Sequence, residues 1–381
     1  MVQARNISTD SFSSMISSKL TRNPENMKKV LYMVAIATLA IVSCTKDNTK
    51  EVNRGHAIDF RVATTRATET TTENLTKIWV TAIGESLNSH FTEVEFTKDG
   101  NYFVTPNAYY WPADGSSLTF YAYAPAEATI GGESLTLDGT EQKLTGFAPV
   151  SEIKSQLDVT AAVANGSKAD SENGVELIFD HILTQVEIQA YSNNTGYKHK
   201  VKGVRIGKVG SKGDYDFKLR DWDLSGDKDN YQVTYDTPVE LTAEYKNIMG
   251  DYGKEVTDPS RNGNAMLIPQ AHTPWDVTND PTNTALGAYI AVLVNIETAE
   301  GAVVFPETKD AYDWVAFPLD DEWIRGFKYV YKLDFTNGSG YKDPEGTDND
   351  GESVVGGKIQ FTHVIDSWST STPTDTDVEM E

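Results

Sequence analysis

The sequence predicts an all-β protein built from two β-sandwich domains. Apolar and polar residues alternate with a period of two in many short segments, as in half-buried strands. Glycine, asparagine and proline separate these segments at short intervals, which is typical of β-sandwiches. No segment carries a sustained apolar stripe with the period of a helix, and only Glu152–Leu157 is expected to form a helical turn or two.

The first element in chain order is a short apolar segment that predicts export. A two-lysine head precedes fourteen uncharged residues, Val30–Ser43, and Cys44, the only cysteine of the chain, follows directly. A membrane-spanning helix needs about 20 apolar residues, so residues 1–43 are interpreted as a cleaved secretory signal, with Met27 as an alternative start. The Ile-Val-Ser-Cys sequence that ends at Cys44 resembles the bacterial lipobox, which implies lipid attachment to that thiol.

The next segments predict a tether and a first strand. Residues 44–56 are polar and charged, as in a flexible linker. In the strand that follows, Ile58, Phe60 and Val62 alternate with polar residues and are therefore expected on one face. A threonine-rich polar link containing Arg66 comes directly after it.

The rest of the chain predicts a succession of short strands. The Asp99-Gly100 pair predicts a tight hairpin, because such turns need positive φ. The polar segment Ala164–Asn173 places the domain boundary near residue 174, which gives domains 57–174 and 175–381. The predicted strands are Leu75–Ile83, Phe91–Phe96, Tyr102–Val104, Leu118–Ala124, Val175–Ile188, Val201–Ile206, Tyr231–Tyr235, Val239–Tyr245, Ala288–Ile296 and Tyr329–Phe335.

The charge and cysteine content exclude several classes of function. The chain carries a net charge of -23, and residues 1–43 contain five basic and two acidic side chains, so the part from Cys44 onward carries -26. This balance argues against nucleic acid as a partner, because phosphates require a basic surface. With one cysteine no internal disulfide can form, so stability must come from apolar burial.

No catalytic, cofactor or metal site is predicted. The sequence lacks the G-x-S-x-G, H-E-x-x-H, P-loop and G-x-G-x-x-G motifs, so an enzyme is not expected. His181 lies on an apolar strand and is expected to be a hydrogen-bonded core residue. Asp221–Asp229 and Asp343–Glu352 have oxygen-rich spacings, but the first has Gln232 where a calcium loop needs glutamate. An ordinary turn is favoured there, and calcium binding by either acidic loop stays open.

Five short motifs run in order along the predicted sandwiches. They are Tyr110-Trp111-Pro112 with Leu118–Pro125, Phe179–Thr184, Leu267–Gln270, Trp323–Tyr331, and Lys358–Phe361 leading to Trp368. Together they resemble the fimbrillins, surface pilus subunits of Gram-negative gut and oral anaerobes. The resemblance implies two transthyretin-like β-sandwich domains, export as a lipoprotein, proteolysis after an arginine and assembly by donor-strand exchange.

The sequence and this resemblance predict a structural or adhesive subunit of a surface pilus. Stalk, tip and anchor positions all stay open. The subunit is expected to reach the outer membrane through a lipid on Cys44, and its expected partners are other pilin subunits and a host protein or glycan. The alternative is a glycan-binding surface lipoprotein that does not polymerise.

Processing is expected after Arg66, before Ala67, by a trypsin-like protease. Only this arginine lies in an exposed-looking link behind the whole first strand, so only this cut frees residues 57–66. A strand from a neighbouring subunit would then replace the removed one. The candidate donor residues are Ile359, Phe361 and Val364.

Overall fold

The computed structural model describes residues 57–64, 75–126, 130, 132, 134–250, 263–346, 351–356 and 359–367. All of them belong to one compact unit, Asn53–Glu381. The predicted signal and tether lie outside the described residues, as does the link at residues 65–74. No helix within the described ranges is long and apolar enough to cross a membrane.

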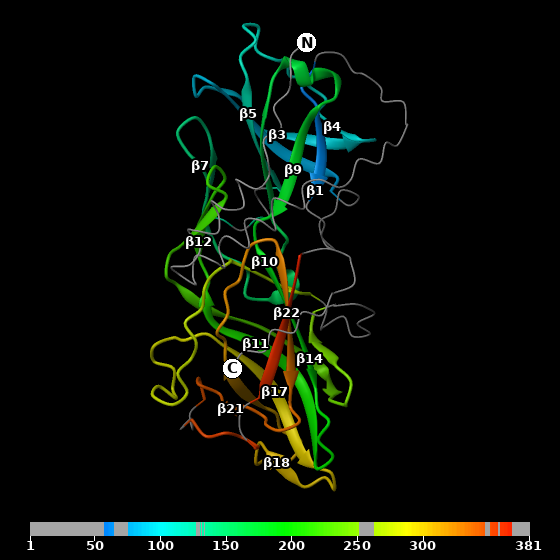
Figure 1. Ribbon diagram of the computed structural model, residues 1–381, viewed down its shortest axis with the longest axis vertical. Coiled ribbons are helices and arrows are strands. Elements are labelled where there is room, and N and C mark those ends of the chain that lie inside the picture. Colours follow the sequence, from blue (N-terminus) through cyan, green and yellow to red (C-terminus); the bar gives the residue numbers. More distant parts are fainter. Residues whose placement is uncertain are drawn as a thin grey trace, which may run out of the picture. The chain divides into compact units, whose positions relative to one another are not determined.

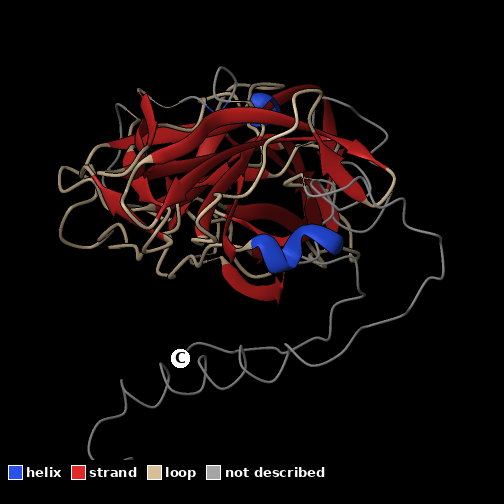
Figure 2. Ribbon diagram, turned by 90° about the horizontal axis from the view of Figure 1, so that it is seen from above, coloured by secondary structure: helices blue, strands red, loops and turns tan. Residues whose placement is uncertain are grey.

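The described chain is almost entirely β-structure, which confirms the predicted fold class (Figure 2). Helix is limited to short turns such as η2 (Ile153–Ser155), which lies in the predicted helical segment, and η3 (Lys168–Glu172). The strands are β1 (Phe60–Thr64), β2 (Lys77–Gly84), β3 (Ser89–Asp99), β4 (Tyr102–Val104), β5 (Leu118–Ala124), β6 (Ser134–Leu137), β7 (Gln142–Phe147), β8 (Thr160–Gly166), β9 (Val175–His181), β10 (Thr184–Tyr191), β11 (Tyr197–Gly210), β12 (Gly213–Asp216), β13 (Asp221–Leu224), β14 (Lys228–Glu240), β15 (Lys246–Met249), β16 (Ala265–Leu267), β17 (Tyr289–Thr298), β18 (Val303–Phe305), β19 (Asp313–Pro318), β20 (Phe327–Asp334), β21 (Tyr341–Lys342) and β22 (Gln360–Ser367).

Seven of the described strands form a closed sheet in the order β1-β4-β3-β2-β5-β8-β9, and the pairing of β9 with β1 completes the circuit (Figure 1). The β3–β4 turn confirms the predicted hairpin. Asp99 pairs with Tyr102 across two loop residues, and Gly100 has a φ of 64°, which glycine adopts without steric cost. The inward-facing side chains of these strands form one apolar core.

Two further sheets form a sandwich from later parts of the chain. One has the order β15-β10-β20-β22, with β16 beside β10; the other has the order β14-β11-β17-β19-β21, with β18 beside β17. A single core joins them, since Ile188 and Tyr331 of the first sheet share it with Val204 and Val292 of the second. Alternating apolar residues on each strand therefore face the opposite sheet.

A fourth described sheet, β13-β12-β7-β6, combines strands from both sides of residue 174. The pairing of β12 with β7 joins Gly213 to Phe147 and Tyr215 to Leu144. A separate apolar core containing Tyr215 and Leu144 packs here. The chain segments before and after residue 174 are thus connected by a shared sheet, and the assignment of two domains stays a prediction.

The prediction of one strand over Val175–Ile188 is wrong. This segment forms β9 in the closed sheet and β10 in the sandwich, with Ile182 and Leu183 between them. Both of these side chains are buried, which breaks the alternation of a single strand. The N–H of Ile182 donates to the carbonyl of Val159, whereas the carbonyl of Leu183 accepts from Gly326, so the chain changes sheets at this point.

Candidate functional site

The first predicted strand fills the core of the closed sheet. Ile58 and Phe60 are 1% and 0% exposed, and Val62 is half-buried against the same core. The Phe60 ring makes edge-on contacts with Phe96 and Phe120, with ring centroids 4.8 and 5.1 Å apart. All three residues predicted to lie on the inward face therefore do so, as the alternating sequence requires.

The backbone of β1 is the main ladder partner of β9. The two strands run parallel over five residue pairs, from Phe60 with Val175 onward, and the N–H of Val175 donates to the carbonyl of Asp59 over 2.9 Å. On its other side β1 pairs antiparallel with β4 through Phe60 and Phe103. By contrast, β9 shares only two residue pairs with β8. Without β1, most of β9 and one edge of β4 would lose their ladder partner among the described strands.

The candidate donor residues lie in or next to β22, which is the terminal strand of its sheet and pairs antiparallel with β20 (Figure 1). Ile359 is 5% exposed, and the half-buried Phe361 ring lies 5.3 Å from Phe317 between centroids. Both residues face the sandwich core. Val364 is also buried, but strand alternation places it on the opposite face, so His363 rather than Val364 continues the inward row.

His363 meets a buried carboxylate that sequence reasoning missed. Its Nδ1 lies 3.3 Å from Oδ2 of Asp321, and both side chains are 9% exposed. The same oxygen accepts from the hydroxyl of Tyr331 over 2.8 Å, and that hydroxyl accepts from Nε1 of Trp323 over 2.9 Å. Burial raises the pKa of the Asp321 carboxyl, while His363 and the Tyr331 hydroxyl counteract the shift. No local signal links Asp321 to a strand some forty residues later in the sequence.

The other predicted residues have ordinary structural places or lie outside the described part of the chain. Cys44, Arg66 and Ala67 lie outside the described residues. His181 is a buried core residue whose Nδ1 lies 2.8 Å from Oδ1 of Asp158, which confirms the expectation.

The two acidic segments are part of the fold around them. Asp221–Leu224 forms strand β13, and Asp343 forms an ion pair with the buried Arg205. Across the described part of the chain, no group of three or more histidine, cysteine, aspartate or glutamate residues is placed to hold a metal ion.

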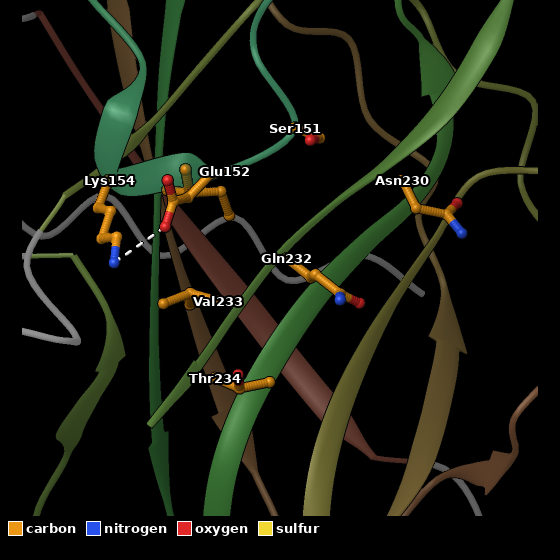
Figure 3. Close-up of a pocket in the computed structure, with 8 residues that line it drawn as sticks. Ser151, Glu152, Lys154, Asn230, Gln232, Val233 and Thr234 are labelled. Carbon is orange, nitrogen blue, oxygen red and sulfur yellow. Dashed lines mark ion pairs between the residues drawn. The ribbon is translucent and has the colours of Figure 1, made fainter. Parts of the chain in front are cut away.

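A polar cavity of about 580 Å³ lies between the η2 loop and the edge strand β14 (Figure 3). The loop contributes Glu152 and Lys154, which form an ion pair of 2.9 Å. Across from them, strand β14 presents Asn230, Gln232 and Thr234. Ligand pockets are usually lined by apolar and aromatic side chains, whereas this lining is mainly polar and includes no aromatic residue. The cavity therefore gives no support for a small-molecule site.

Fold and site together define an all-β protein whose first strand fills one core and whose last described strand lies at a sheet edge. The comparisons agree. A family model described as fimbrillin-like matches residues 65–360. A fimbrium subunit, Fim1C of Phocaeicola vulgatus, is 27% identical over 191 residues, which are 42% of this chain and 50% of that protein. The chain thus matches about half the length of this relative.

A solved structure shows a similar fold. A fimbrial protein from Bacteroides vulgatus superposes with a TM-score of 0.55 at 16% identity, covering 83% of this chain and all of that one. A fimbrilin from Porphyromonas gingivalis has a TM-score of 0.45 at 10% identity, covering 83% of this chain and 98% of that one. The family match spans most of the sequence, so this chain belongs to the fimbrillin-like family, a family of structural proteins rather than enzymes.

Proposed function

We propose that this protein is a stalk or tip subunit of a cell-surface fimbrium that is assembled by strand exchange. The observation that carries the proposal is the position of β1, a core-filling strand between β4 and β9 whose following link contains Arg66. Export to the outer membrane as a lipoprotein modified at Cys44 would place the subunit where assembly occurs. The match to a fimbrium subunit supports this assignment.

Removal of β1 after Arg66 would leave a groove with an exposed apolar floor and with unpaired backbone groups along its edges. Loss of the buried Ile58 and Phe60 side chains alone would remove roughly 3–6 kcal/mol of stabilisation, at about 1.5–3 kcal/mol for each fully buried side chain. The edges of β4 and β9 would gain unpaired backbone groups, which form a template for an incoming strand. A strand from another subunit can pair with these edges and also fill the apolar sites only if it carries apolar residues at alternate positions.

The region of β22 carries such a pattern. Ile359 and Phe361 repeat the spacing of Ile58 and Phe60, with isoleucine and phenylalanine in the same order. His363 would then occupy the half-buried position of Val62, where an imidazole can reach solvent. This match supports a β22 segment as donor and a copy of the same chain as an acceptor.

The experiment that tests this function compares Arg66→Ala with Arg61→Ala in the source organism or a related host. Arg66→Ala should be exported and folded but remain monomeric, because β1 stays in its groove. Arg61→Ala leaves the cleavage site intact and should still assemble. Surface-sheared material, run on a gel without boiling, should give a ladder for the wild type and Arg61→Ala and a single band for Arg66→Ala.

The N-terminal residue of assembled subunits decides between this mechanism and its alternatives. Sequencing should begin at Ala67. A polymer whose subunits still begin at Cys44 would refute removal of β1, and a wild-type chain that gives only a single band would favour a non-polymerising surface lipoprotein. Cys44→Ala tests the anchor separately, since it should no longer fractionate with the outer membrane.

A further inference from the structure

In the inward-facing row of β22, His363 is a polar side chain that follows two apolar ones. Ile359 and Phe361 pack into the sandwich core, and His363 follows two residues later on the same face. Ring centroids of Tyr329 and Tyr331 lie 6.2 and 5.9 Å from the imidazole, so it is enclosed by aromatic side chains. A valine or leucine would suit such a site by burial alone.

The carboxylate of Asp321 gives the histidine a specific partner. Among the side chains of Gln360–Ile365, that of His363 makes a polar contact outside β22. Its Nδ1 lies 3.3 Å from Oδ2 of Asp321. The main chain of Asp321 is fixed as well, because its carbonyl accepts from the backbone N–H of His272 over 3.0 Å. The residue is therefore held by Tyr331 and His272 as well, through contacts that do not involve β22.

We propose that Asp321 and His363 form a latch that fixes the register of β22 on β20 and retains the strand in its own subunit. A shift of β22 by two residues would bring Phe361 or Ile365 against the buried carboxylate of Asp321, which would lose its histidine contact and keep only the hydrogen bond from Tyr331. Replacing a buried ion pair by apolar residues often costs no stability, and the best-attested role of such a pair is to select one register. The latch thus specifies the register strongly and retains the strand weakly.

For assembly, the latch sets how often β22 is free to leave, a consequence that rests on the proposed strand exchange. When β22 departs, Asp321 keeps its hydrogen bond from Tyr331 and gains access to water. The desolvation of the carboxylate, which raises its pKa in the closed subunit, is relieved at the same time. Release is therefore opposed by loss of the histidine contact and favoured by rehydration, which keeps the strand exchangeable.

Hydrogen–deuterium exchange of the full-length monomer tests the latch directly. Asp321→Asn and His363→Phe each remove one half of it, and the phenylalanine keeps the aromatic packing. Amides of β22 should exchange about 10-fold faster in each variant, as expected for the loss of one buried polar contact. The double variant should be no faster than the faster single one, because the two changes remove the same interaction.

Two controls keep the outcome decisive. Asp320→Asn makes the same chemical change at an exposed neighbouring carboxylate and should leave β22 protection unchanged. His363→Gln keeps an N–H donor and should restore part of the protection. Unchanged protection of β22 in both single variants, or equal acceleration in β11 and β22, would overturn the latch.

An assembly assay separates this proposal from the proposed function. Processed subunits of Asp321→Asn should add to seeds faster than the wild type if β22 is the donor. Faster exchange of β22 without faster assembly would support the latch and count against donation by β22. Unchanged exchange would reject the latch whatever the assembly rate.

Discussion

Replacing Phe60 by alanine should destabilise the unprocessed subunit and leave the assembled one unaffected. The Phe60 side chain is fully buried and contacts two other rings edge-on, at 4.8 and 5.1 Å. Buried phenylalanine-to-alanine changes cost about 3–5 kcal/mol, and the two aromatic contacts, each adding about 0.5–1.5 kcal/mol, place this site in the upper half of that range. We therefore expect a loss of about 4–5 kcal/mol.

Urea unfolding of the purified, uncleaved chain measures this loss. Glu176→Ala is a suitable control, because this exposed residue on β9 lies beside Arg61 of β1 and should change stability by less than about 0.5 kcal/mol. Subunits that begin at Ala67 no longer contain Phe60, so polymers from the variant should unfold at the wild-type midpoint. A loss below about 1 kcal/mol in the monomer, or an equal loss in the polymer, would refute the reasoning.

Three further predictions follow from buried side chains. Asp158→Ala should cost about 3 kcal/mol in urea unfolding, because it removes the partner of the 1% exposed His181, and a loss under 1 kcal/mol would contradict this. Burial lowers the pKa of His199 to about 4. The unfolded chain therefore binds the proton more readily than the folded one, and the free energy of unfolding should fall by about 3 kcal/mol as the pH drops from 6.5 to 4. His199→Gln should flatten that decline between pH 7 and 4.5, and an unchanged slope would rule the histidine out as its cause. Phe361→Ser should fold and be processed yet give shorter ladders on unboiled gels, whereas full-length ladders would exclude this residue as a donor anchor.

Local patterns were sufficient to predict the strands that have one buried face and one solvent-exposed face. The alternation around Phe60 identified both the strand and its inward face, because a period of two depends only on neighbouring residues. The Asp99-Gly100 pair located a hairpin for the same reason. In β10, however, nearly every residue is buried, including the polar Gln185 and Glu187. Alternation therefore carries no information about where β9 ends and β10 begins.

Pairing between distant segments could not be predicted. The sequence placed Phe60 and Val175 on strands but contains no signal that they are neighbours in a parallel ladder. The contact of His363 with Asp321 is similar, because a lone histidine in an apolar row is compatible with many partners. Val364 is one of the candidate donor residues, and only the register with β20 shows that it faces away from the core that contains Phe361.

The parallel pairing of β1 with β9 also orders events in time. Phe60 and Val175 are 115 positions apart, so β1 emerges during synthesis or export long before its partner exists. Pairing between such distant segments forms slowly, because the entropy of closing a long loop is lost before the contact contributes any stabilisation. A protease that met the chain before this closure would remove β1 before it had served as the template for β9. If β1 is removed as proposed, folding must therefore precede processing, and the buried first strand acts as a folding aid.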